Sequence, residues 1–357
     1  MAMPLRAGFI GTGRISDLHA IAYLNDSPAK IVALCDQNTA LARGRAEAWG
    51  LDDVFVTGDV DALLSRPDVD LVEILLPHHL HFPVAMKAIA AGKTVSLQKP
   101  MCTSLEEADR LVAAAAASGR PFRVFENFIF FPPIVRARQL LDAGAIGDPI
   151  SIRIKSNSGT SRTAWDVPRE AIRWRLERET SGGGPLVFDD GHHKFALAWH
   201  FMGNPESVHA YIGRTKVADS VVLDAPSIVS FLFPGNRIGS FEIVHSPELE
   251  IATRHYAQDD RVEITGTHGV IWVNCGHGRL GDTPPVVHYR DGRLIPHSDM
   301  PTGWEQSFVQ ATRHYFDCLA NGQPAALSAS DARQVLRFAL AAEESGQTGK
   351  RVDVDLD

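Results

Sequence analysis

Short apolar runs alternate with longer stretches of helical periodicity over the first 127 residues. This alternation predicts a parallel sheet with crossover helices, because neighbouring parallel strands need a long connection between them. The expected helices cover residues 39–49, 83–91 and 105–117. The expected strands cover residues 6–10, 31–35, 71–76, 94–97 and 122–125.

The pattern changes after Pro132-Pro133, where apolar and polar positions begin to alternate in short segments. Such alternation is typical of antiparallel strands that place one face on a core. The segments are residues 150–155, 227–233, 240–244, 262–265 and 270–273, with helices expected at 305–320 and 329–344 and a closing strand at 349–354. The sequence thus predicts an α/β protein with a doubly wound parallel sheet in residues 1–127 and a mostly antiparallel sheet in residues 128–357.

Composition narrows the class of function. With 357 residues and 45% hydrophobic positions, the chain can build two cores, and its net charge of −8 argues against a nucleic-acid partner. The four cysteines are widely spaced without a C-x-x-C pair, so neither a disulfide framework nor a thiolate zinc site is indicated. We see no signal peptide and no apolar run of about 18 residues. We therefore expect a cytoplasmic protein without a membrane partner that acts on a small molecule.

A glycine-containing turn, Gly11-Thr12-Gly13-Arg14-Ile15-Ser16, directly follows the first expected strand. Glycines at such a turn let the backbone approach a pyrophosphate, whose charge then lies at a helix N-terminus. Asp36 ends the second strand, 20 residues after Ser16, where a carboxylate can accept hydrogen bonds from both ribose hydroxyls of adenosine. The same carboxylate repels a 2′-phosphate, so NAD is favoured over NADP. A tight turn followed by an ordinary surface acid is the alternative.

Lys99 and Pro100 stop the expected strand at 94–97. Ligands of open α/β sheets bind beyond the carboxyl ends of the strands, so Lys99 should face the same crevice as the cofactor. Pro100 cannot continue the strand and fixes the backbone after Lys99, with a cis bond as one way to do so. A solvated loop lysine is the alternative interpretation.

These features, taken in order, resemble the glucose-fructose oxidoreductase and inositol dehydrogenase family, often called Gfo/Idh/MocA. The resemblance covers nearly the whole chain, and it implies an N-terminal Rossmann domain followed by an α/β domain with a large open antiparallel sheet. It also implies NAD(P)-dependent oxidation or reduction of sugars, polyols or related alcohols. The motifs that carry it are GxGxxS with Asp36, Pro77-His78-His79-Leu80-His81-Phe82-Pro83, Ala91-Gly92-Lys93, Gln98-Lys99-Pro100, Glu126-Asn127, Gly144-Ala145-Ile146-Gly147, Gly182-Gly183-Gly184, Asp189-Asp190-Gly191-His192-His193 and Ile264-Thr265-Gly266-Thr267-His268-Gly269.

The resemblance assigns catalytic roles to Lys99, Asp189 and His193. Lys99 matches the lysine of the family's Glu-Lys-Pro motif, and Asp189 with His193 matches its Asp-x-x-x-His pair. Residues four apart on a helix share a face, so the carboxylate and the imidazole can point into one cleft. We expect His193 to act as the base, Lys99 to stabilise the charge on the reacting oxygen, and Asp189 to position the sugar or support proton transfer. A capping acid and a buried structural histidine remain the alternative.

The sequence departs from the family pattern at two places. Gln98 replaces the usual glutamate, which removes a negative charge beside Lys99 and should make a desolvated Lys99 easier to deprotonate. The stretch from the triple glycine to Asp189 is one residue longer than the common spacing, which makes Asp190 a rival for the acid.

Further binding residues are expected around this set. On the cofactor side they are Gly11, Gly13, Arg14, Ile15, Asp36, Pro77, His78, His81, Gln98 and Lys99; on the substrate side they are Lys99, Asn127, Arg173, Trp174, Asp189, His192 and His193. Arg173 and Trp174 belong to a segment rich in arginine and tryptophan, residues 162–178, which is alternatively a solvated rim. The histidines of the chain show no HExxH-type spacing, so we expect no metal.

The expected function is therefore hydride transfer between NAD and a secondary or hemiacetal hydroxyl of a sugar, inositol or related polyol. Two other functions stay open: an NAD-retaining glycosidase that oxidises its sugar transiently, and a non-catalytic sensor of NAD or sugar. Retention of Lys99, Asp189 and His193 argues against the sensor. The resemblance also implies a homo-oligomer, a dimer or tetramer, formed through the C-terminal sheet.

Overall fold

The computed structural model describes residues 4–25, 27–218 and 221–354. It divides into two compact units. The first takes in the chain up to Asn127 together with Glu179–Gly182 and Phe308–Leu336, and the second takes in Phe128–Arg178, Gly183–Ser307 and the chain from Arg337 onward. The hydrophobic pattern alone did not assign the segment Phe308–Leu336 to the first unit.

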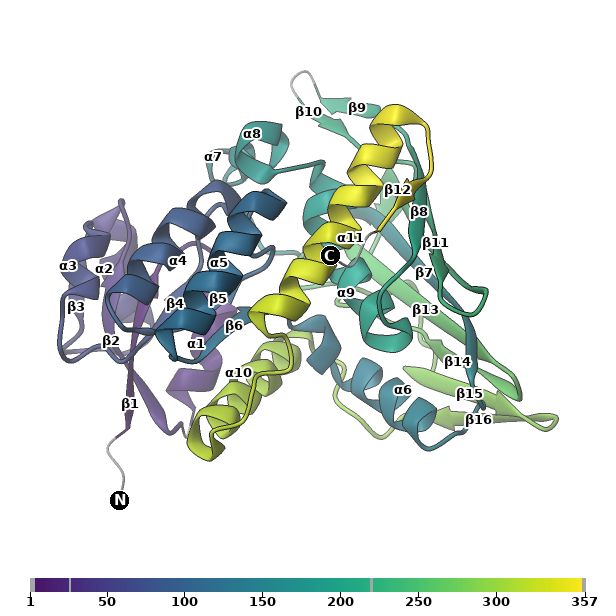
Figure 1. Cartoon of the computed structure of the whole chain (residues 1–357), viewed down its shortest axis with the longest axis horizontal. Coiled ribbons are helices and arrows are strands. Elements are labelled where there is room, and N and C mark those ends of the chain that lie inside the picture. The colour runs from purple at the N-terminus through teal and green to yellow at the C-terminus, as the bar shows by residue number, and fades with distance from the viewer. Residues whose placement is uncertain (1–3, 26, 219–220, 355–357) are drawn as a thin grey trace. The chain divides into compact units, whose positions relative to one another are not determined.

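The first unit is built on a six-stranded sheet with the strand order β3-β2-β1-β4-β5-β6 (Figure 1). Every neighbouring pair in this sheet is parallel, which confirms the expected doubly wound fold. The strand order reverses between β1 and β4, and ligands of such sheets bind at that point, beyond the carboxyl ends of the strands. The strands are β1 (Leu5–Ile10), β2 (Ala29–Cys35), β3 (Phe55–Thr57), β4 (Leu71–Ile74), β5 (Thr94–Gln98) and β6 (Phe122–Phe125).

Helices of the first unit begin and end at local signals in the sequence. Ser104 caps α5 by accepting a hydrogen bond from the backbone N–H of Glu107, and Gly119 ends that helix in the left-handed region, at a φ of 62°. Ala20 and Tyr23 of α1 pack with Phe9 and Leu34 of the sheet in one hydrophobic core. The helices are α1 (Ser16–Leu24), α2 (Thr39–Ala48), α3 (Val60–Leu64), α4 (His81–Ala90) and α5 (Leu105–Ser118).

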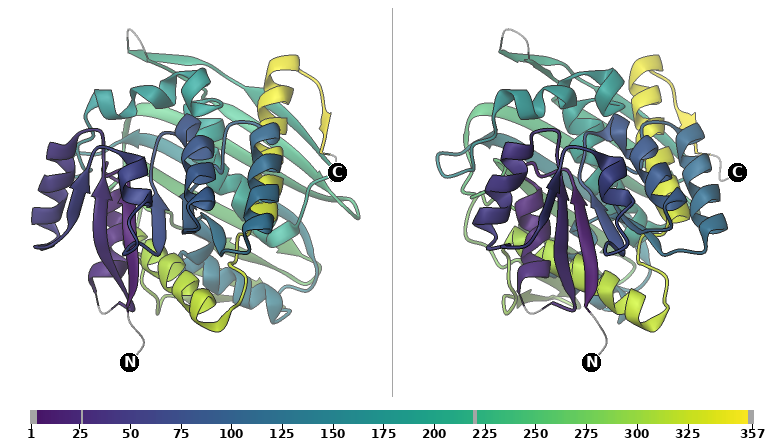
Figure 2. Two further views of the ribbon diagram at one scale, coloured as in Figure 1. Left: turned by 60° about the vertical axis from the view of Figure 1, so that its left-hand side comes forward. Right: turned by 90° about the vertical axis from the view of Figure 1, so that its left-hand side faces the viewer.

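The second unit contains a nine-stranded sheet with the order β16-β15-β14-β13-β7-β12-β11-β8-β17. Only β7 and β12 pair in parallel there, so the sheet is mostly antiparallel, as expected, and Figure 2 shows its strands side by side with a marked twist. The strands are β7 (Pro149–Thr160), β8 (Ser207–Ile212), β11 (Ser227–Phe233), β12 (Arg237–Glu250), β13 (Gln258–Gly266), β14 (Gly269–Val273), β15 (Val286–Arg290), β16 (Arg293–His297) and β17 (Val352–Asp353), with β9 (Thr215–Ala218) and β10 (Val221–Leu223) in a separate hairpin.

One face of the nine-stranded sheet packs against α9 through aromatic side chains. Phe195 of α9 contacts Phe231 and Phe241 of the sheet and Phe338 of α11, with ring centroids 5.0–6.0 Å apart. The remaining helical elements of the chain are η1 (His78–Leu80), η2 (Phe128–Phe130), α6 (Pro132–Asp142), α7 (Arg169–Ile172), η3 (Arg173–Leu176), α8 (Arg178–Ser181), η4 (Pro185–Asp190), α9 (Gly191–Met202), α10 (Trp304–Asn321) and α11 (Ala329–Thr348). None of the helices in the described residues is long and apolar enough to cross a bilayer.

Candidate functional site

The turn between β1 and α1 leaves its backbone open to a ligand. Gly11 has a φ of +96°, and a Cβ there would lie 2.3 Å from the carbonyl oxygen of Leu75, so only glycine fits. No atom lies within 4 Å of where a Cβ of Gly13 would stand. Helix α1 begins at Ser16 without a side-chain cap. The turn therefore offers free space at a helix N-terminus, which suits a pyrophosphate.

Asp36 ties the end of β2 to this turn. Its carboxylate accepts hydrogen bonds from the backbone N–H and the hydroxyl of Thr12, at 2.8 and 2.9 Å, and from the backbone N–H of Asn38 at 2.9 Å. Ser16, in place of the third glycine, is fully buried and donates its hydroxyl to the carbonyl of Gly13 at 2.7 Å. These contacts hold the carboxylate beside the turn where the adenosine ribose of a dinucleotide lies.

His81 connects the ends of β4 and β5. Its ring nitrogens lie 2.6 Å from the carbonyl oxygen of Pro100 and 2.8 Å from that of Leu76. Burial lowers the pKa of His81 to about 3, which favours the neutral ring, although the two carbonyl oxygens oppose this shift and a neutral ring can donate to only one of them. Lys99 is buried directly after β5, and the Lys99–Pro100 bond is cis.

His78 lies in the same loop and contacts another segment of the first unit. Its Nδ1 is 2.7 Å from the carbonyl oxygen of Ser181. The roles of Pro77, His78 and His81 at the cofactor stay predictions. The contacts above show that His78 and His81 also hold the backbone of neighbouring segments.

The expected acid lies in the second unit, in a π-helical turn, η4, that leads into α9. A π-turn accommodates one residue more than an α-helical turn, and it occurs at the place where the sequence is one residue longer than the family spacing. Asp189 and Asp190 consequently face different partners. Asp189 pairs with Arg175 at 3.1 Å, whereas Asp190 pairs with Lys194 at 3.0 Å and accepts from Gln258 at 2.7 Å.

Two buried carboxylates hold the backbone of this turn. Asp224 accepts from the N–H groups of Leu186 and Val187 at 2.8 and 2.7 Å, and burial raises its pKa to about 6. Glu343 of α11 accepts from the N–H of Gly184 at 3.1 Å and pairs with Arg178. The direction of Asp189 and of the helix that carries His193 is therefore set from outside the motif.

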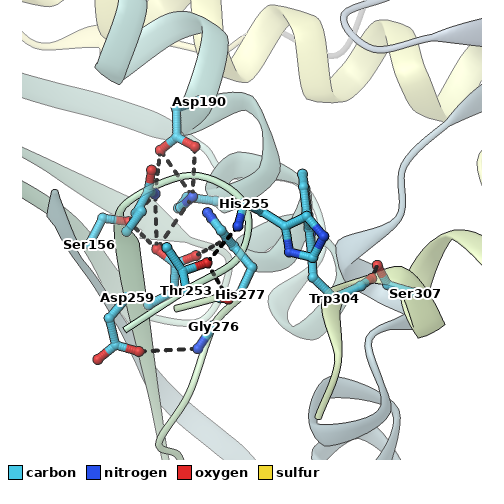
Figure 3. A network of polar contacts seen from close by, with 12 residues as sticks. Ser156, Asp190, Thr253, His255, Asp259, Gly276, His277, Trp304 and Ser307 are labelled. Atoms are coloured by element: carbon cyan, nitrogen blue, oxygen red, sulfur yellow. Dashed lines mark hydrogen bonds and ion pairs between the residues drawn. The ribbon is translucent and has the colours of Figure 1, made fainter. Parts of the chain in front are cut away.

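A group of rings surrounds His193 in the second unit. Phe128 stacks on the imidazole of His193 with centroids 4.4 Å apart and contacts the ring of His277 edge-on at 6.1 Å. His277 in turn lies 4.8 Å from Trp304, as Figure 3 shows. Neither ring nitrogen of His277 makes a hydrogen bond, although the side chain is 3% exposed. Sequence reasoning did not identify these rings, because no motif marks them.

A polar network that includes Ser156 and Asp190 is drawn in Figure 3, and the ammonium of Lys194 pairs with Asp190 in it. Lys194 is fully buried and pairs with Asp190 and with Asp260. Burial opposes its charge, but the two carboxylates together raise the pKa of Lys194 above its usual value. Ser156 and Gln258 both donate to Oδ1 of Asp260. Asp190 is thus a member of this structural network.

The remaining expected substrate residues are partly exposed and partly buried. Arg173 has a side chain 79% exposed and pairs with Glu177, while Trp174 donates its indole N–H to the carbonyl of Ala171. Arg175, which was not singled out from the sequence, is the arginine of this segment that meets Asp189. Asn127 and His192 are buried in the first and second unit. Within the described residues, no group of three or more histidine, cysteine or acidic side chains is placed to hold a metal ion.

Comparison with known proteins identifies both units. The model of an oxidoreductase family with an NAD-binding Rossmann fold matches residues 5–126, and the model of that family's C-terminal alpha/beta domain matches residues 138–354. D-apiose dehydrogenase of Paraburkholderia graminis is 28% identical over 359 residues, which span 98% of this chain and 89% of that protein. The NAD(+)-dependent scyllo-inositol 2-dehydrogenase of Bacillus subtilis is 25% identical over 365 residues, which span 100% and 98% of the two chains.

A solved structure has the same fold over its whole length. Levoglucosan dehydrogenase in complex with NADH and L-sorbose superposes with a TM-score of 0.82 at 22% identity, covering 99% of each chain. The open turn at Gly13, the placement of Asp36 and these matches all agree with the resemblance drawn from the motifs. The chain therefore belongs to the Gfo/Idh/MocA family of oxidoreductases, and its first unit carries the family's NAD-binding Rossmann fold.

Proposed function

We propose that this protein is an NAD-dependent dehydrogenase that oxidises or reduces a secondary or hemiacetal carbon of a sugar, inositol or related polyol. The observation that carries the proposal is the position of Lys99, which follows β5 at the same carboxyl edge of the sheet that holds Gly13 and Asp36. A lysine there reaches the ligand side of the Rossmann sheet. NAD, when bound, supplies the hydride acceptor.

Removal of a hydride from an alcohol carbon requires the hydroxyl proton to leave as well. We assign the base to His193, because a neutral imidazole suits proton transfer near physiological pH. The ammonium of Lys99 stabilises the negative charge that develops on the substrate oxygen. Asp189 positions the substrate or supports the transfer.

Asp189 is a better candidate for the acid than Asp190. The carboxylate of Asp190 is committed to Lys194 and Gln258 within the polar network. Asp189 pairs with the guanidinium of Arg175, and that arginine keeps 35% of its side chain exposed. Arg175 therefore joins the proposed site as a residue whose positive charge favours the carboxylate form of Asp189.

The substrate class follows from chemistry and from the relatives. The second unit gathers imidazole and aromatic rings near His193, and such rings can pack on the apolar faces of polyhydroxylated molecules. The relatives named above act on apiose and scyllo-inositol by their names, and levoglucosan dehydrogenase binds L-sorbose in its solved structure. We propose a substrate of the same kind.

We further propose a homo-oligomer formed through the nine-stranded sheet, in the cytoplasm. Tyr211 and Ile228 are direct neighbours on β8 and β11, and their side chains are 75% and 43% exposed. Apolar neighbours of this size on an open sheet face favour burial against a second copy. The four cysteines are free and buried, which suits a reducing compartment.

The test is NADH formation at 340 nm with purified protein, NAD and a panel of aldoses, inositols, other polyols and glycosides. Lys99→Met and His193→Asn are run beside the wild type, with exposed His209→Gln as the control histidine variant. We expect NADH with at least one polyol, a loss of about 10²-fold or more in kcat for the two site variants, and no change for the control. Consumption of a glycoside without NADH would instead support the NAD-retaining glycosidase.

A further inference from the structure

Gln98 and His19 link the backbone of Lys99 to a buried carboxylate inside the first unit. The backbone N–H of Lys99 donates to Oε1 of Gln98 at 2.8 Å. The amide nitrogen of Gln98 lies 2.9 Å from Nε2 of His19, and Nδ1 of His19 faces the carboxylate of Glu73 across 3.6 Å. A continuous polar path thus runs from the residue after β5 to β4.

The direction of each contact follows from the chemistry of its ends. A backbone N–H can only donate, so the oxygen of Gln98 faces Lys99 and its amide nitrogen faces His19. Because that amide also donates, Nε2 of His19 accepts with its lone pair, and the ring proton is on Nδ1, toward Glu73. A neutral imidazole therefore accepts from Gln98 and turns its own N–H toward Glu73, 3.6 Å away.

The far end of the path is anchored firmly. Glu73 is fully buried, accepts the hydroxyl of Tyr23 at 2.7 Å and meets the guanidinium of Arg123 at 3.3 Å. Arg123 also donates to the hydroxyl of Ser96 on β5 at 2.9 Å. Both β5 and β6 are thereby tied to the carboxylate against which His19 stands.

The imidazole of His19 is also packed against aromatic rings and kept neutral. It contacts the rings of Phe125 and Phe308, with centroid distances of 4.1 and 5.2 Å. Burial lowers the pKa of His19, Glu73 opposes this shift, and Arg123 adds to it. The ring accordingly has little freedom to turn or to take up a second proton.

We propose that Gln98 and His19 are positioning residues for Lys99, which fix its backbone through a chain of hydrogen bonds from Lys99 to Gln98 and from Gln98 to His19, whose Nδ1 faces the carboxylate of Glu73. The proposal rests on the function proposed above, because it takes Lys99 to act on the substrate oxygen. It also explains what the amide at position 98 achieves. A carboxylate there would still accept from Lys99, but it would face the lone pair of His19 and force a buried second proton onto the ring.

A matched pair of substitutions at position 19 tests the chain of hydrogen bonds. The amide of an asparagine reproduces the Nδ1 side of histidine, whereas that of a glutamine reaches the Nε2 position. We expect His19→Gln to keep kcat within about 3-fold of wild type and His19→Asn to lower it by about 10- to 100-fold, since a small misplacement of a catalytic group has effects of this size. The KM for the polyol and the Kd for NAD should change little in either variant.

Equal losses of kcat in the two variants, or a loss that appears in the Kd for NAD and the melting temperature alone, would overturn the proposal. If no polyol is turned over by the wild type, the proposed function fails, but the hydrogen-bond chain from Lys99 to His19 can still be examined. NMR of the protein labelled with ¹⁵N-histidine should then show His19 as the neutral Nδ1–H tautomer, and the opposite tautomer or an imidazolium would overturn the chain itself.

A third variant, Gln98→Glu, addresses the charge of the chain. The introduced carboxylate raises the pKa of His19, so the chain is complete only while the ring carries two protons, and kcat relative to wild type should fall as pH rises. The double variant Gln98→Glu/His19→Gln has no titrating ring and should lose this dependence. A dependence that persists in the double variant would come from Lys99 and would contradict the role given to His19.

Discussion

At Asp189 the neighbouring guanidinium of Arg175 supplies the opposite charge. The two groups are 3.1 Å apart and the carboxylate is 3% exposed, and a cation this close favours the charged form of a buried acid. Asp190, the next residue, has the same chemistry but belongs to the network around Lys194. Adjacent carboxylates in this chain thus have separate tasks.

This separation predicts opposite results for two conservative substitutions. Asp189→Asn should lower kcat by about 10²-fold with little change in stability, because it removes a group proposed to act on the substrate. Asp190→Asn should lower the free energy of unfolding by roughly 1–3 kcal/mol, because it weakens the pairing of a buried ammonium, and should leave kcat nearly unchanged. Steady-state kinetics and urea denaturation check both, and a larger kcat effect for Asp190→Asn would reverse our assignment.

We expect Asp36 to govern the choice of cofactor at the same scale. Its carboxylate lies beside the turn of the Rossmann fold, where it can accept hydrogen bonds from ribose hydroxyls and would repel a 2′-phosphate. We expect Asp36→Asn to raise the KM for NAD by about 10-fold or more, since hydrogen bonds to a charged group contribute roughly 1.5–3 kcal/mol. The ratio of kcat/KM for NADP to that for NAD should rise, and an unchanged ratio would show that Asp36 does not select the cofactor.

Residues with a fixed place in a motif could be identified from the sequence. Asp36 and Lys99 follow buried strands, and the carboxyl ends of parallel strands meet at one edge, so the pattern was sufficient. Arg175 was not identified, because it lies among other arginines in short helical turns. Such turns are too short for a hydrophobic period to show which way each side chain points. His19 and His277 were missed for a related reason: each is buried, and burial of a single polar residue leaves no pattern.

Among the elements, the π-helical turn η4 determines where the acid and the base point. The extra residue before Asp189 was visible in the sequence, but the pattern could not say whether a loop or a helix absorbs it. The structure resolves this through Asp224, which holds the N–H groups of Leu186 and Val187. Several long elements with a buried face, such as α5, α11 and β11, were predicted well, whereas the short edge strands β3 and β16 were not, because they bury too little to show alternation.

The buried carboxyl of Asp224 predicts a pH dependence of stability. Its pKa in the folded protein is about 6, raised by burial from an ordinary value of 3.8. Protonation therefore favours the folded state, and this contribution is complete below about pH 3.8 and is lost as pH rises through about 6. The loss amounts to at most about 3 kcal/mol.

Asp224→Asn provides the comparison, since it cannot titrate while other groups still do. From pH 4.5 to pH 7.5, the unfolding free energy of the wild type should fall relative to that of the variant by roughly 1–3 kcal/mol, as measured by urea denaturation. A constant difference across this range would mean that the carboxyl of Asp224 keeps an ordinary pKa.

For the whole molecule, we expect self-association through the exposed face of the nine-stranded sheet. Tyr211→Lys combined with Ile228→Lys places two like charges on neighbouring strands of the proposed interface. Light scattering after size exclusion should show a smaller particle for this variant than for the wild type. Leu41→Lys, at an exposed apolar residue of α2, is the control and should leave the mass unchanged. A wild type that is monomeric at micromolar concentration would refute the interface.

The central claim is that a substrate carbon gives its hydride to NAD and that NADH leaves as a product. The most direct measurement uses the best polyol of the panel with deuterium on the reacting carbon and determines the mass of the NADH released. We predict NADH heavier by one mass unit, formed in equal amount to the ketone or lactone. Consumption of the substrate with deuterium lost and no labelled NADH released would contradict the account.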